Sequence, residues 1–248
     1  EVEPPTGPPL AEGHSKFFGC IYAWHTEEYF EAYWNQVTPE NAGKWGSVEG
    51  TMDAMNWGDL DDAYDFALEN NFPFRFHTLV WGNQQPSWIR ELDSASQRQH
   101  IEEWFSLAAA GYDSADMVEV VNEPISDPPE QSPTDITEGR TDYGGYKDAL
   151  GGDGVTGWDW VVEAFRLARQ NFSDTTVLMI NEYGIVSSIS KTMQYREIIE
   201  ILQEEDTLID AIGVQSHAFS ISGSGTITQS LDSLAATGLP IYITELDI

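Results

Sequence analysis

The sequence is poor in three things that would point to particular functions: cysteine, basic side chains and long apolar runs. Its single cysteine, Cys20, excludes a disulfide bond within the chain. Only 11 Lys and Arg residues stand against 42 Asp and Glu residues, giving a formal net charge of −31. Nucleic acid and anionic membranes are bound through clustered Lys and Arg. The composition therefore argues against both as partners, and it favours a neutral ligand over a polyanion.

No apolar run approaches the roughly 18 residues that a membrane-spanning helix needs. Residues 1–13 are polar and proline-rich and lack the basic-then-apolar pattern of a secretion signal. We expect them to be a tail or linker left after processing, followed by one domain over residues 14–248. The acidic balance has two interpretations that stay open here, a well-solvated surface and adaptation to high salt.

Short apolar segments alternate with amphipathic ones along the chain. The predicted strands are Phe17–Tyr22, Val37–Pro39, Pro73–Thr78, Met117–Val121, Thr176–Ile180, Ala211–Val214 and Leu239–Thr244. The predicted helices are Glu27–Gln36, Leu60–Asn70, Ser96–Ala110, Trp158–Asn171, Lys191–Glu204 and Thr228–Thr237. Strands that alternate with helices predict an α/β protein with parallel strands joined by right-handed crossovers.

Polar or aromatic residues follow six of these strands, and their distribution favours a barrel. In a (β/α)8 TIM barrel the carboxyl ends of all strands meet on one face, which carries the active site. An open doubly wound sheet would gather its ligand groups at one switch point, commonly with a glycine-rich first turn that this chain lacks. The residues at the strand ends are Asn41 and Lys44, His77 and Trp81, Asn122 and Glu123, Asn181 and Glu182, Gln215 and His217, and Glu245.

Two glutamates at strand ends carry the strongest chemical signal. Glu123 lies in Val-Val-Asn-Glu-Pro at 120–124, and Glu245 lies in Ile-Thr-Glu-Leu-Asp-Ile at 243–248. A pair of carboxyl groups is the minimal machinery for cutting a glycosidic bond, one as acid/base and the other as nucleophile or base. The alternative for either residue is a solvated carboxylate at a strand end.

Other motifs do not point to a cofactor or a metal. Residues 152–157 match G-x-G-x-x-G and precede a predicted helix, but they follow a long polar loop where a dinucleotide site requires a strand. The five histidines form no H-E-x-x-H, and one cysteine cannot build the usual zinc sites. We therefore expect no cofactor and no metal.

Seven motifs occur in order beside the predicted strands, and together they resemble glycoside hydrolase family 10 endo-β-1,4-xylanases from about Phe17 onward. They are Trp-Asn-Gln-Val-Thr-Pro-Glu-Asn-Ala-Gly-Lys-Trp at 34–45, His-Thr-Leu-Val-Trp at 77–81, Gln84 with Pro-Ser-Trp at 86–88, Val-Val-Asn-Glu-Pro at 120–124, Asn-Glu-Tyr at 181–183, Val-Gln-Ser-His at 214–217 and the closing motif at 243–248. Asn-Glu-Pro alone recurs among barrel glycosidases, whereas the ordered set is specific.

The resemblance implies a secreted enzyme that cleaves xylan or xylo-oligosaccharides with retention of configuration. Glu123 would be the acid/base and Glu245 the nucleophile, with their carboxyl groups about 5–5.5 Å apart. The resemblance further implies that Asn122 binds the sugar 2-hydroxyl, and that His217 and Asp247 hold Glu245. The implied contacts on the glycone side are Glu40, Asn41, Lys44, His77, Trp81, Gln84 and Gln215.

The chain departs from the family pattern at Gly82 and at its carboxyl end. Gly82 stands where the family usually has a histidine, which removes a donor near the cleft. The long loop Ile125–Gly157 follows the acid/base and is expected to shape the aglycone side. The family also continues into an eighth strand beyond the nucleophile, so we expect seven strands here and a fragment of a longer barrel. We expect the complete barrel to be a monomer. Were the chain complete, low stability and weak hydrolysis would follow. Two alternatives stay open: a xylan-binding remnant without catalysis, and a glycosidase for another neutral β-glycan.

Overall fold

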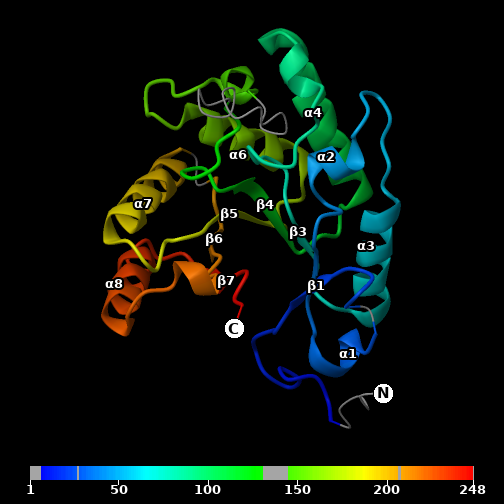
Figure 1. Ribbon diagram of the computed structural model, residues 1–248, viewed down its shortest axis with the longest axis vertical. Helices are drawn as coiled ribbons and strands as arrows, with labels where there is room; N and C mark the ends of the chain where they lie inside the picture. The colour runs from blue at the N-terminus through cyan, green and yellow to red at the C-terminus, as the bar shows by residue number, and fades with distance from the viewer. Residues whose placement is uncertain (1–6, 27, 131–144, 206–207, 248) are drawn as a thin grey trace.

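A computed structural model describes residues 7–26, 28–130, 145–205 and 208–247 of the chain (Figure 1). Its strands are β1 (Cys20–Tyr22), β2 (Val37–Pro39), β3 (Arg75–Phe76), β4 (Met117–Asn122), β5 (Val177–Glu182), β6 (Ala211–Val214) and β7 (Ile241–Ile243). The α-helices are α1 (Phe30–Tyr33), α2 (Trp45–Val48), α3 (Gly58–Asn70), α4 (Ser94–Gly111), α6 (Asp159–Asn171), α7 (Ile189–Glu204) and α8 (Ser224–Ala235). Short 3-10 helices occur at η1 (Ile89–Glu91), η2 (Lys147–Leu150) and η3 (Ala218–Ser220).

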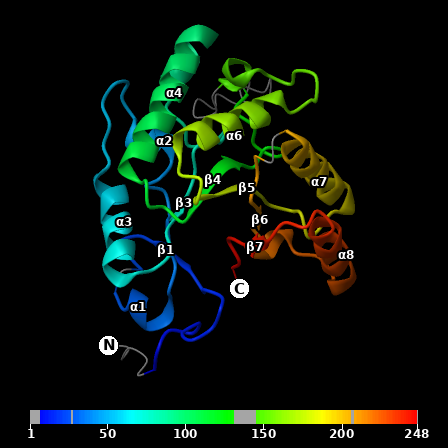
Figure 2. The same ribbon diagram turned by 180° about the vertical axis from the view of Figure 1, so that it is seen from behind.

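All paired strands are parallel and follow chain order, which confirms the predicted β/α architecture. β1 pairs with β2, and β3 to β7 form a five-stranded sheet in sequence order. A bridge between Val37 and Phe74 links the two sheets. Figures 1 and 2 show helices on the outside of these strands, α3 and α4 on one side and α7 and α8 on the other. The described residues thus form seven consecutive strands of a TIM-type barrel wall.

The prediction of one helix over Glu27–Gln36 was wrong for the residues that the structure describes there, 28–36. Only one helical turn, α1, forms there. Tyr29 precedes it with a left-handed backbone (φ 65°), and Trp34 after it is already extended. The side chain of Asn35 then accepts a hydrogen bond from the amide of Phe18 at 2.8 Å. The apolar periodicity was real, but the chain must turn early to enter β2.

The core lies in two layers, as a filled barrel requires. Between strands and helices, the rings of Trp45, Trp104 and Trp57 stack in sequence, with centroids 5.9 and 5.6 Å apart. Inside the barrel, at its amino-terminal end, a second cluster contains Met117 and Met179. The two layers pack the strands on their outer side and at their amino-terminal end.

A bulge in β4 changes which side chains face the barrel interior. Pairing with β5 shifts register between Glu119 and Val121, so one residue is inserted on β4. Asn122 then joins Glu119 on the interior side, where simple alternation would have placed Val121. Both side chains contact Asn181 of β5. The bulge therefore puts Asn122 and the following Glu123 at the mouth of the barrel.

Two predicted segments reach beyond the described residues. Residues 1–6 of the expected tail lie outside them, while the amide of Leu10 donates to the carbonyl oxygen of Tyr33 at 3.1 Å. Residues 131–144 of the loop after Glu123 also lie outside the description. Among the helices that are described, none is long and apolar enough to cross a membrane.

Candidate active site

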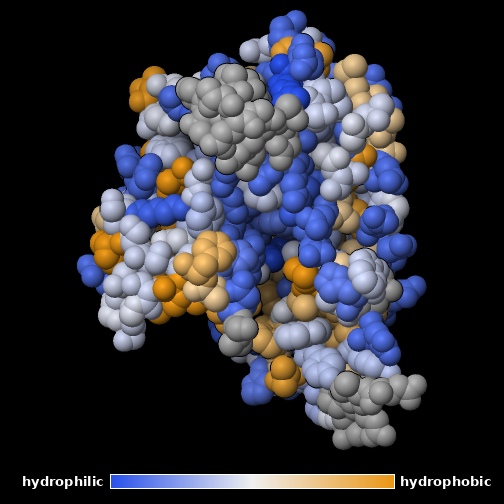
Figure 3. Space-filling model, viewed as in Figure 1, coloured by the Kyte–Doolittle hydropathy of each residue, from blue (hydrophilic) through white to orange (hydrophobic). Residues whose placement is uncertain are grey.

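Glu123 is a buried carboxyl group that directly follows β4. Over the central strands the surface is formed mainly by hydrophilic residues (Figure 3). The backbone of Glu123 is left-handed (φ 53°), a conformation that costs energy in a residue with a side chain. Oε2 accepts a hydrogen bond from Nε1 of Trp81 at 2.9 Å, and Oε1 accepts one from Nε2 of Gln215 at 2.8 Å. Donors from β3 and β6 thus fix the direction of the carboxyl group.

The surroundings of Glu123 favour its protonated form. Its pKa is raised to about 8, chiefly by burial and against the effect of the Gln215 hydrogen bond. A hydrogen bond with the side chain of Asp127 and the charges of Glu182 and Asp127 contribute to the same rise. A carboxyl group with this pKa still holds its proton at neutral pH and can deliver it to a leaving group.

The surroundings of Glu245, which follows β7, favour its ionised form. Oε1 accepts a hydrogen bond from Nδ2 of Asn181 at 2.7 Å, and Oε2 lies 3.1 Å from Nε2 of His217. Burial raises its pKa, but the His217 hydrogen bond, the charges of His77 and Arg75 and the Asn181 amide lower it more, to about 2. Glu245 is therefore an anion at neutral pH.

His217, after β6, and Asp247, after β7, support Glu245 at the strand ends. Nδ1 of His217 lies 3.0 Å from Oδ2 of Asp247, whose other oxygen accepts the amide hydrogen of Ala218. Hydrogen bonding to Glu245 raises the pKa of His217 to about 9, and Asp247 adds to this effect against partial burial. The imidazole is therefore a cation at neutral pH, and it donates to carboxylates from both ring nitrogens.

Glu123 and Glu245 belong to one hydrogen-bonded chain of side chains. From Glu123, Gln215 donates through Nε2 to both that carboxyl group and Oδ1 of Asn122, the latter at 3.2 Å. Asn181 donates through Nδ2 to the same Asn122 oxygen at 3.1 Å and to Glu245. Because Oδ1 of Asn122 receives both donors, its amide nitrogen is the donor of that side chain. The predicted residues of β4, β6 and β7 are thus brought together.

A buried ionic network below the mouth was missed by the sequence analysis. Glu119 is fully buried and pairs with Nη1 of Arg75 at 2.6 Å and with Nδ1 of His77 at 2.5 Å. The guanidinium of Arg75 also donates to the carbonyl oxygen of Thr244 at 3.0 Å, directly before Glu245. A charged residue inside an apolar strand is a signal for such a network, and both Arg75 and Glu119 stand in apolar runs.

Of the predicted glycone-side residues, Gln215 follows β6, and the others lie after β2 and β3. Nζ of Lys44 donates to Oδ1 of Asn41 at 2.7 Å and lies 5.0 Å from the Trp81 ring centre. Burial lowers the pKa of Lys44, although the charges of Glu245, Glu123 and Glu40 oppose this. His77 faces inward to Glu119, whereas Gln84 is exposed beside Lys44 and Trp81 at the rim. Lys44, Asn41 and Trp81 therefore form one polar and aromatic group.

Glu182, at the end of β5, holds the loop that follows Glu123. Oε2 accepts from the amides of Ile125 and Ser126 at 2.9 and 3.3 Å, and Oε1 pairs with Nζ of Lys191 at 3.0 Å. Its side chain is fully buried. Glu182 is thus a support of the loop rather than a group open to a ligand.

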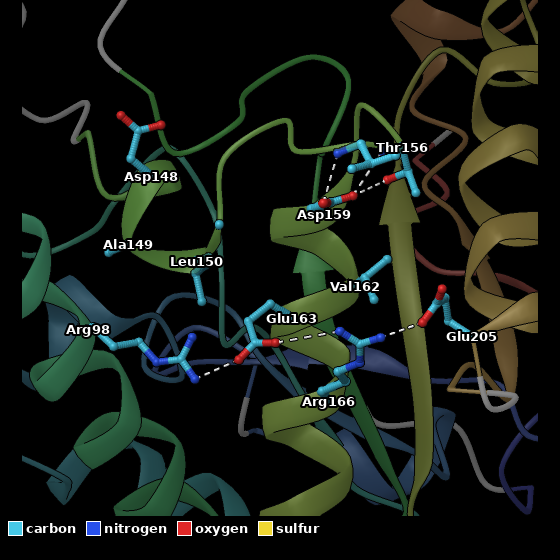
Figure 4. Close-up of a pocket in the computed structure, with 12 residues that line it drawn as sticks. Arg98, Asp148, Ala149, Leu150, Thr156, Asp159, Val162, Glu163, Arg166 and Glu205 are labelled. Carbon is cyan, nitrogen blue, oxygen red and sulfur yellow. Dashed lines mark hydrogen bonds and ion pairs between the residues drawn. The ribbon is translucent and has the colours of Figure 1, made fainter.

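The loop 152–157 contributes no ligand site of the dinucleotide kind. The carboxylate of Asp159 accepts the amide hydrogens of Val155 and Thr156 at 2.9 and 3.0 Å, so it occupies the donors that would face a phosphate (Figure 4). The adjoining cavity of about 590 Å³ lies outside the barrel wall. Its arginines are paired with acids in the series Arg98, Glu163, Arg166 and Glu205.

Two groups of described side chains place three metal-ligating atoms within 4.8 Å of one another. The first is His77, Glu119 and Glu245, where Arg75 already neutralises Glu119. The second is Glu49, Asp53 and His100 on the outer face. Glu49 accepts hydrogen bonds from Nε1 of Trp45 at 2.8 Å and from the amide of Asp53 at 2.9 Å. Protein groups thus satisfy the buried carboxylates of both groups.

A β/α barrel wall that brings one protonated and one ionised carboxyl group to its mouth has the architecture of the barrel glycoside hydrolases. Within that class, the chain belongs to glycosyl hydrolase family 10, whose family model matches residues 13–248. The resemblance stated from the motifs is thereby confirmed.

Named relatives cover most of this chain but extend well beyond it. Endo-1,4-beta-xylanase B of Cellvibrio japonicus is 36% identical over 220 residues, which are 88% of this chain and 33% of that protein. Endo-1,4-beta-xylanase 3 of Hypocrea jecorina is 33% identical over 86% of this chain and 57% of its own length. The chain therefore spans between a third and three fifths of these two relatives.

Solved structures agree with the fold. The structure of GH10 from Paenibacillus barcinonensis superimposes with a TM-score of 0.78 at 27% identity, covering 92% of this chain and 68% of that one. Xylanase 10B from Thermotoga maritima gives a TM-score of 0.73 at 26% identity, covering 93% and 69%. Both support the TIM-barrel fold class.

Proposed function

We propose that this chain carries the catalytic centre of a retaining endo-β-1,4-xylanase. The observation that carries the proposal is the opposite displacement of two pKa values within one hydrogen-bonded chain, to about 8 for Glu123 and about 2 for Glu245. Family membership and relatives named as endo-1,4-beta-xylanases support xylan as the substrate. The catalytic domain would comprise residues 14–248, with residues 1–13 as a tail.

In the first step, a carboxylate oxygen of Glu245 bonds to the anomeric carbon while the bond from that carbon to the leaving sugar oxygen breaks. The proton of Glu123 passes to that oxygen. In the second step, Glu123 takes a proton from water, and the water oxygen displaces Glu245 from the sugar. The roughly 5–5.5 Å separation of the two carboxyl groups that this mechanism requires stays a prediction.

The remaining polar residues have roles that follow from their contacts. His217, held by Asp247, would keep the Glu245 carboxylate in one orientation. Asn122, whose amide is fixed as a donor, would bind the sugar 2-hydroxyl. Glycone-side contacts would come from Glu40, Asn41, Lys44, His77, Trp81, Gln84 and Gln215. Because a polymer such as xylan does not cross a membrane, we propose that the enzyme acts outside the cell.

The test is the release of reducing ends from xylan by the protein, with Glu245→Ala as the blank. Release that disappears in the blank supports the proposal, and proton NMR of the first product gives its anomeric configuration. Retention predicts the β-anomer first. Glu123→Ala should still release the phenol from an aryl xylobioside whose leaving group needs no proton, because the acid role is bypassed in the first step. The release should be a burst followed by slow turnover, because the second step still lacks its base.

The two alternatives predict other results in the same assay. A binding remnant would retard on xylan in affinity electrophoresis and release no reducing ends. A glycosidase for another neutral β-glycan would release reducing ends from that glycan and not from xylan. Either result would overturn the proposed substrate or activity.

A further inference from the structure

Tyr146 is a buried tyrosine whose hydroxyl group contacts the backbone of Trp81. It lies in the long loop after Glu123, directly before the 3-10 helix η2, and only 1% of its surface is exposed. Its hydroxyl oxygen accepts a hydrogen bond from the amide of Trp81 at 3.3 Å and donates one to the carbonyl oxygen of Trp81 at 3.1 Å. Burial raises the pKa of this hydroxyl group, so it keeps its proton and can donate.

Trp81 stands at the point where the pairing between the third and fourth strands ends. Val80 still bridges to Val121, and its amide donates to the carbonyl oxygen of Val120 at 3.0 Å. One residue further, the amide of Trp81 donates to Tyr146 instead. In a sheet, backbone groups of the neighbouring strand would bond to this amide and carbonyl. The hydroxyl group of Tyr146 takes their place and holds the backbone of Trp81 where the ladder has ended.

The backbone of Trp81 matters because its side chain orients the predicted acid/base. Nε1 of the indole donates to Oε2 of Glu123 at 2.9 Å, and Gln215 donates to the other oxygen. The side chain of Trp81 is only partly buried, so its surroundings do not enclose it on all sides. A movement of the Trp81 backbone would therefore carry the indole N–H away from Glu123 and leave its carboxyl group with one donor fewer.

Packing accounts for the ring of Tyr146 but not for its hydroxyl group. The ring lies edge-on to Trp45, with centroids 5.6 Å apart and an angle of 73° between the planes. In the same aromatic layer, Phe76 packs on Trp104 without a hydroxyl group. Burying a hydroxyl group costs free energy unless it is hydrogen-bonded. Its two bonds to Trp81 are thus what the hydroxyl group adds to a ring that phenylalanine would supply equally well.

We propose that Tyr146 is a positioning residue for the acid/base: its hydroxyl group holds Trp81, and the indole of Trp81 keeps the carboxyl group of Glu123 aimed at the leaving-group oxygen. The inference rests on the proposed glycosidase function. Tyr146 itself is buried and touches no substrate. Because proton transfer depends on the placement of the acid, loss of the hydroxyl group should slow only those substrates whose leaving group needs a proton.

The experiment compares the parent protein and Tyr146→Phe on phenyl β-xylobioside and dinitrophenyl β-xylobioside. The two substrates share their sugars and have similar aryl groups, but only the phenolate leaving group needs the proton of Glu123. We expect kcat/KM for the phenyl substrate to fall about tenfold, part of the roughly 10²–10⁴ that a general acid contributes. For the dinitrophenyl substrate we expect a change of less than about twofold.

Tyr112→Phe is the matched control. Tyr112 is also buried, and its hydroxyl group donates to Asp61 at 2.7 Å, but it precedes β4 and so lies at the other end of the strand from Glu123. Its loss should change neither substrate by more than about twofold. Urea unfolding checks that each variant is folded under the assay conditions.

Trp81→Phe tests the connection between Tyr146 and the acid/base. It removes the indole N–H, so it should show the same difference between the two substrates. In a Trp81→Phe background, Tyr146→Phe should have no further effect on the phenyl substrate, because the two residues act in series. If Trp81→Phe slows both substrates equally, or if the two effects multiply, the inference is overturned, whatever the folding of Tyr146→Phe.

Two further outcomes of the main comparison would also overturn it. An equal loss on both substrates would show that Tyr146 supports the fold or the sugar contacts, and an unchanged value for the phenyl substrate would show that the hydroxyl group is dispensable. If the parent cleaves neither substrate, the proposed function fails, and the hold on Trp81 is measured without catalysis. Exchange of the Trp81 indole N–H with water, followed by NMR, should then be about tenfold faster in Tyr146→Phe, and an equal rate overturns the inference.

Discussion

The amide of Gly82 donates a hydrogen bond to the carbonyl oxygen of Asp127 at 2.9 Å, so the turn after β3 and the loop after Glu123 meet backbone to backbone. A Cβ atom at position 82 would lie 2.4 Å from that oxygen and 2.2 Å from the carbonyl oxygen of Pro128. From the sequence, Gly82 is visible only as the loss of a hydrogen-bond donor. The structure gives it a positive role, since only glycine lets Asp127 approach Glu123 in this way.

We expect Gly82→Ala to destabilise the protein by about 1–3 kcal/mol, because the added methyl group must displace backbone. Equilibrium urea unfolding measures this. Gly111→Ala is the control, since a Cβ there meets nothing within 4 Å and the position ends α4. It should be neutral or slightly stabilising. Equal stability of Gly82→Ala and the parent would contradict the close approach.

We expect Asp127→Asn to move the alkaline limb of the kcat/KM profile to lower pH. Asp127 raises the pKa of Glu123 through a hydrogen bond and through its charge, and Asn lacks the charge. Each unit by which that pKa falls costs about tenfold in activity above the limb. The pH profile on xylotetraose measures it, with Asp113→Asn on the surface as control. An unmoved limb would mean that burial alone protonates Glu123.

The free energy of unfolding should fall as the pH rises from 5 to 8, and it should fall by less in Glu123→Gln. The folded pKa of Glu123, about 8, lies above its unfolded value near 4.3, so the folded state binds the proton more tightly in this window. Its contribution to stability is therefore lost as the pH rises. We expect the parent to lose at least about 1 kcal/mol more than the variant. Parallel urea-derived stability curves from pH 5 to 8 would argue against a protonated Glu123.

Arg75→Ala should destabilise the fold by about 3–5 kcal/mol, because it leaves the fully buried Glu119 without its cation. Arg196→Ala, which breaks an exposed pair with Glu200, should cost less than about 0.5 kcal/mol. Thermal and urea unfolding of both variants compare the two. A similar small effect at both sites would show that Glu119 takes up a proton instead.

Local sequence patterns were sufficient to place the site residues wherever the repeating β/α unit fixes their position. Each strand-end motif, such as Val-Val-Asn-Glu-Pro at 120–124, was assigned its place because β/α units all point their strand ends to one face. They failed where a contact between distant segments overrides local preference. The helix predicted over Glu27–Gln36 is reduced to one turn, and the side chain of Asn35 there bonds to the amide of Phe18.

The buried ionic network inside the barrel also could not be predicted from local patterns. Arg75 and Glu119 were visible as charges within apolar runs, but their pairing joins strands 44 residues apart. The bulge in β4 that turns Asn122 inward has no signature in the sequence of that strand.

The order of the parallel strands and the residues at their carboxyl ends can be predicted from the sequence, because both follow from local periodicity and the handedness of the crossover. The charge on those residues depends on contacts that form only in the folded protein. Glu123 and Glu245 are the same chemical group, and their pKa values part because burial and Asp127 act on one, while His217, Arg75 and Asn181 act on the other. Those influences come from separate strands and exist only when the barrel wall is assembled.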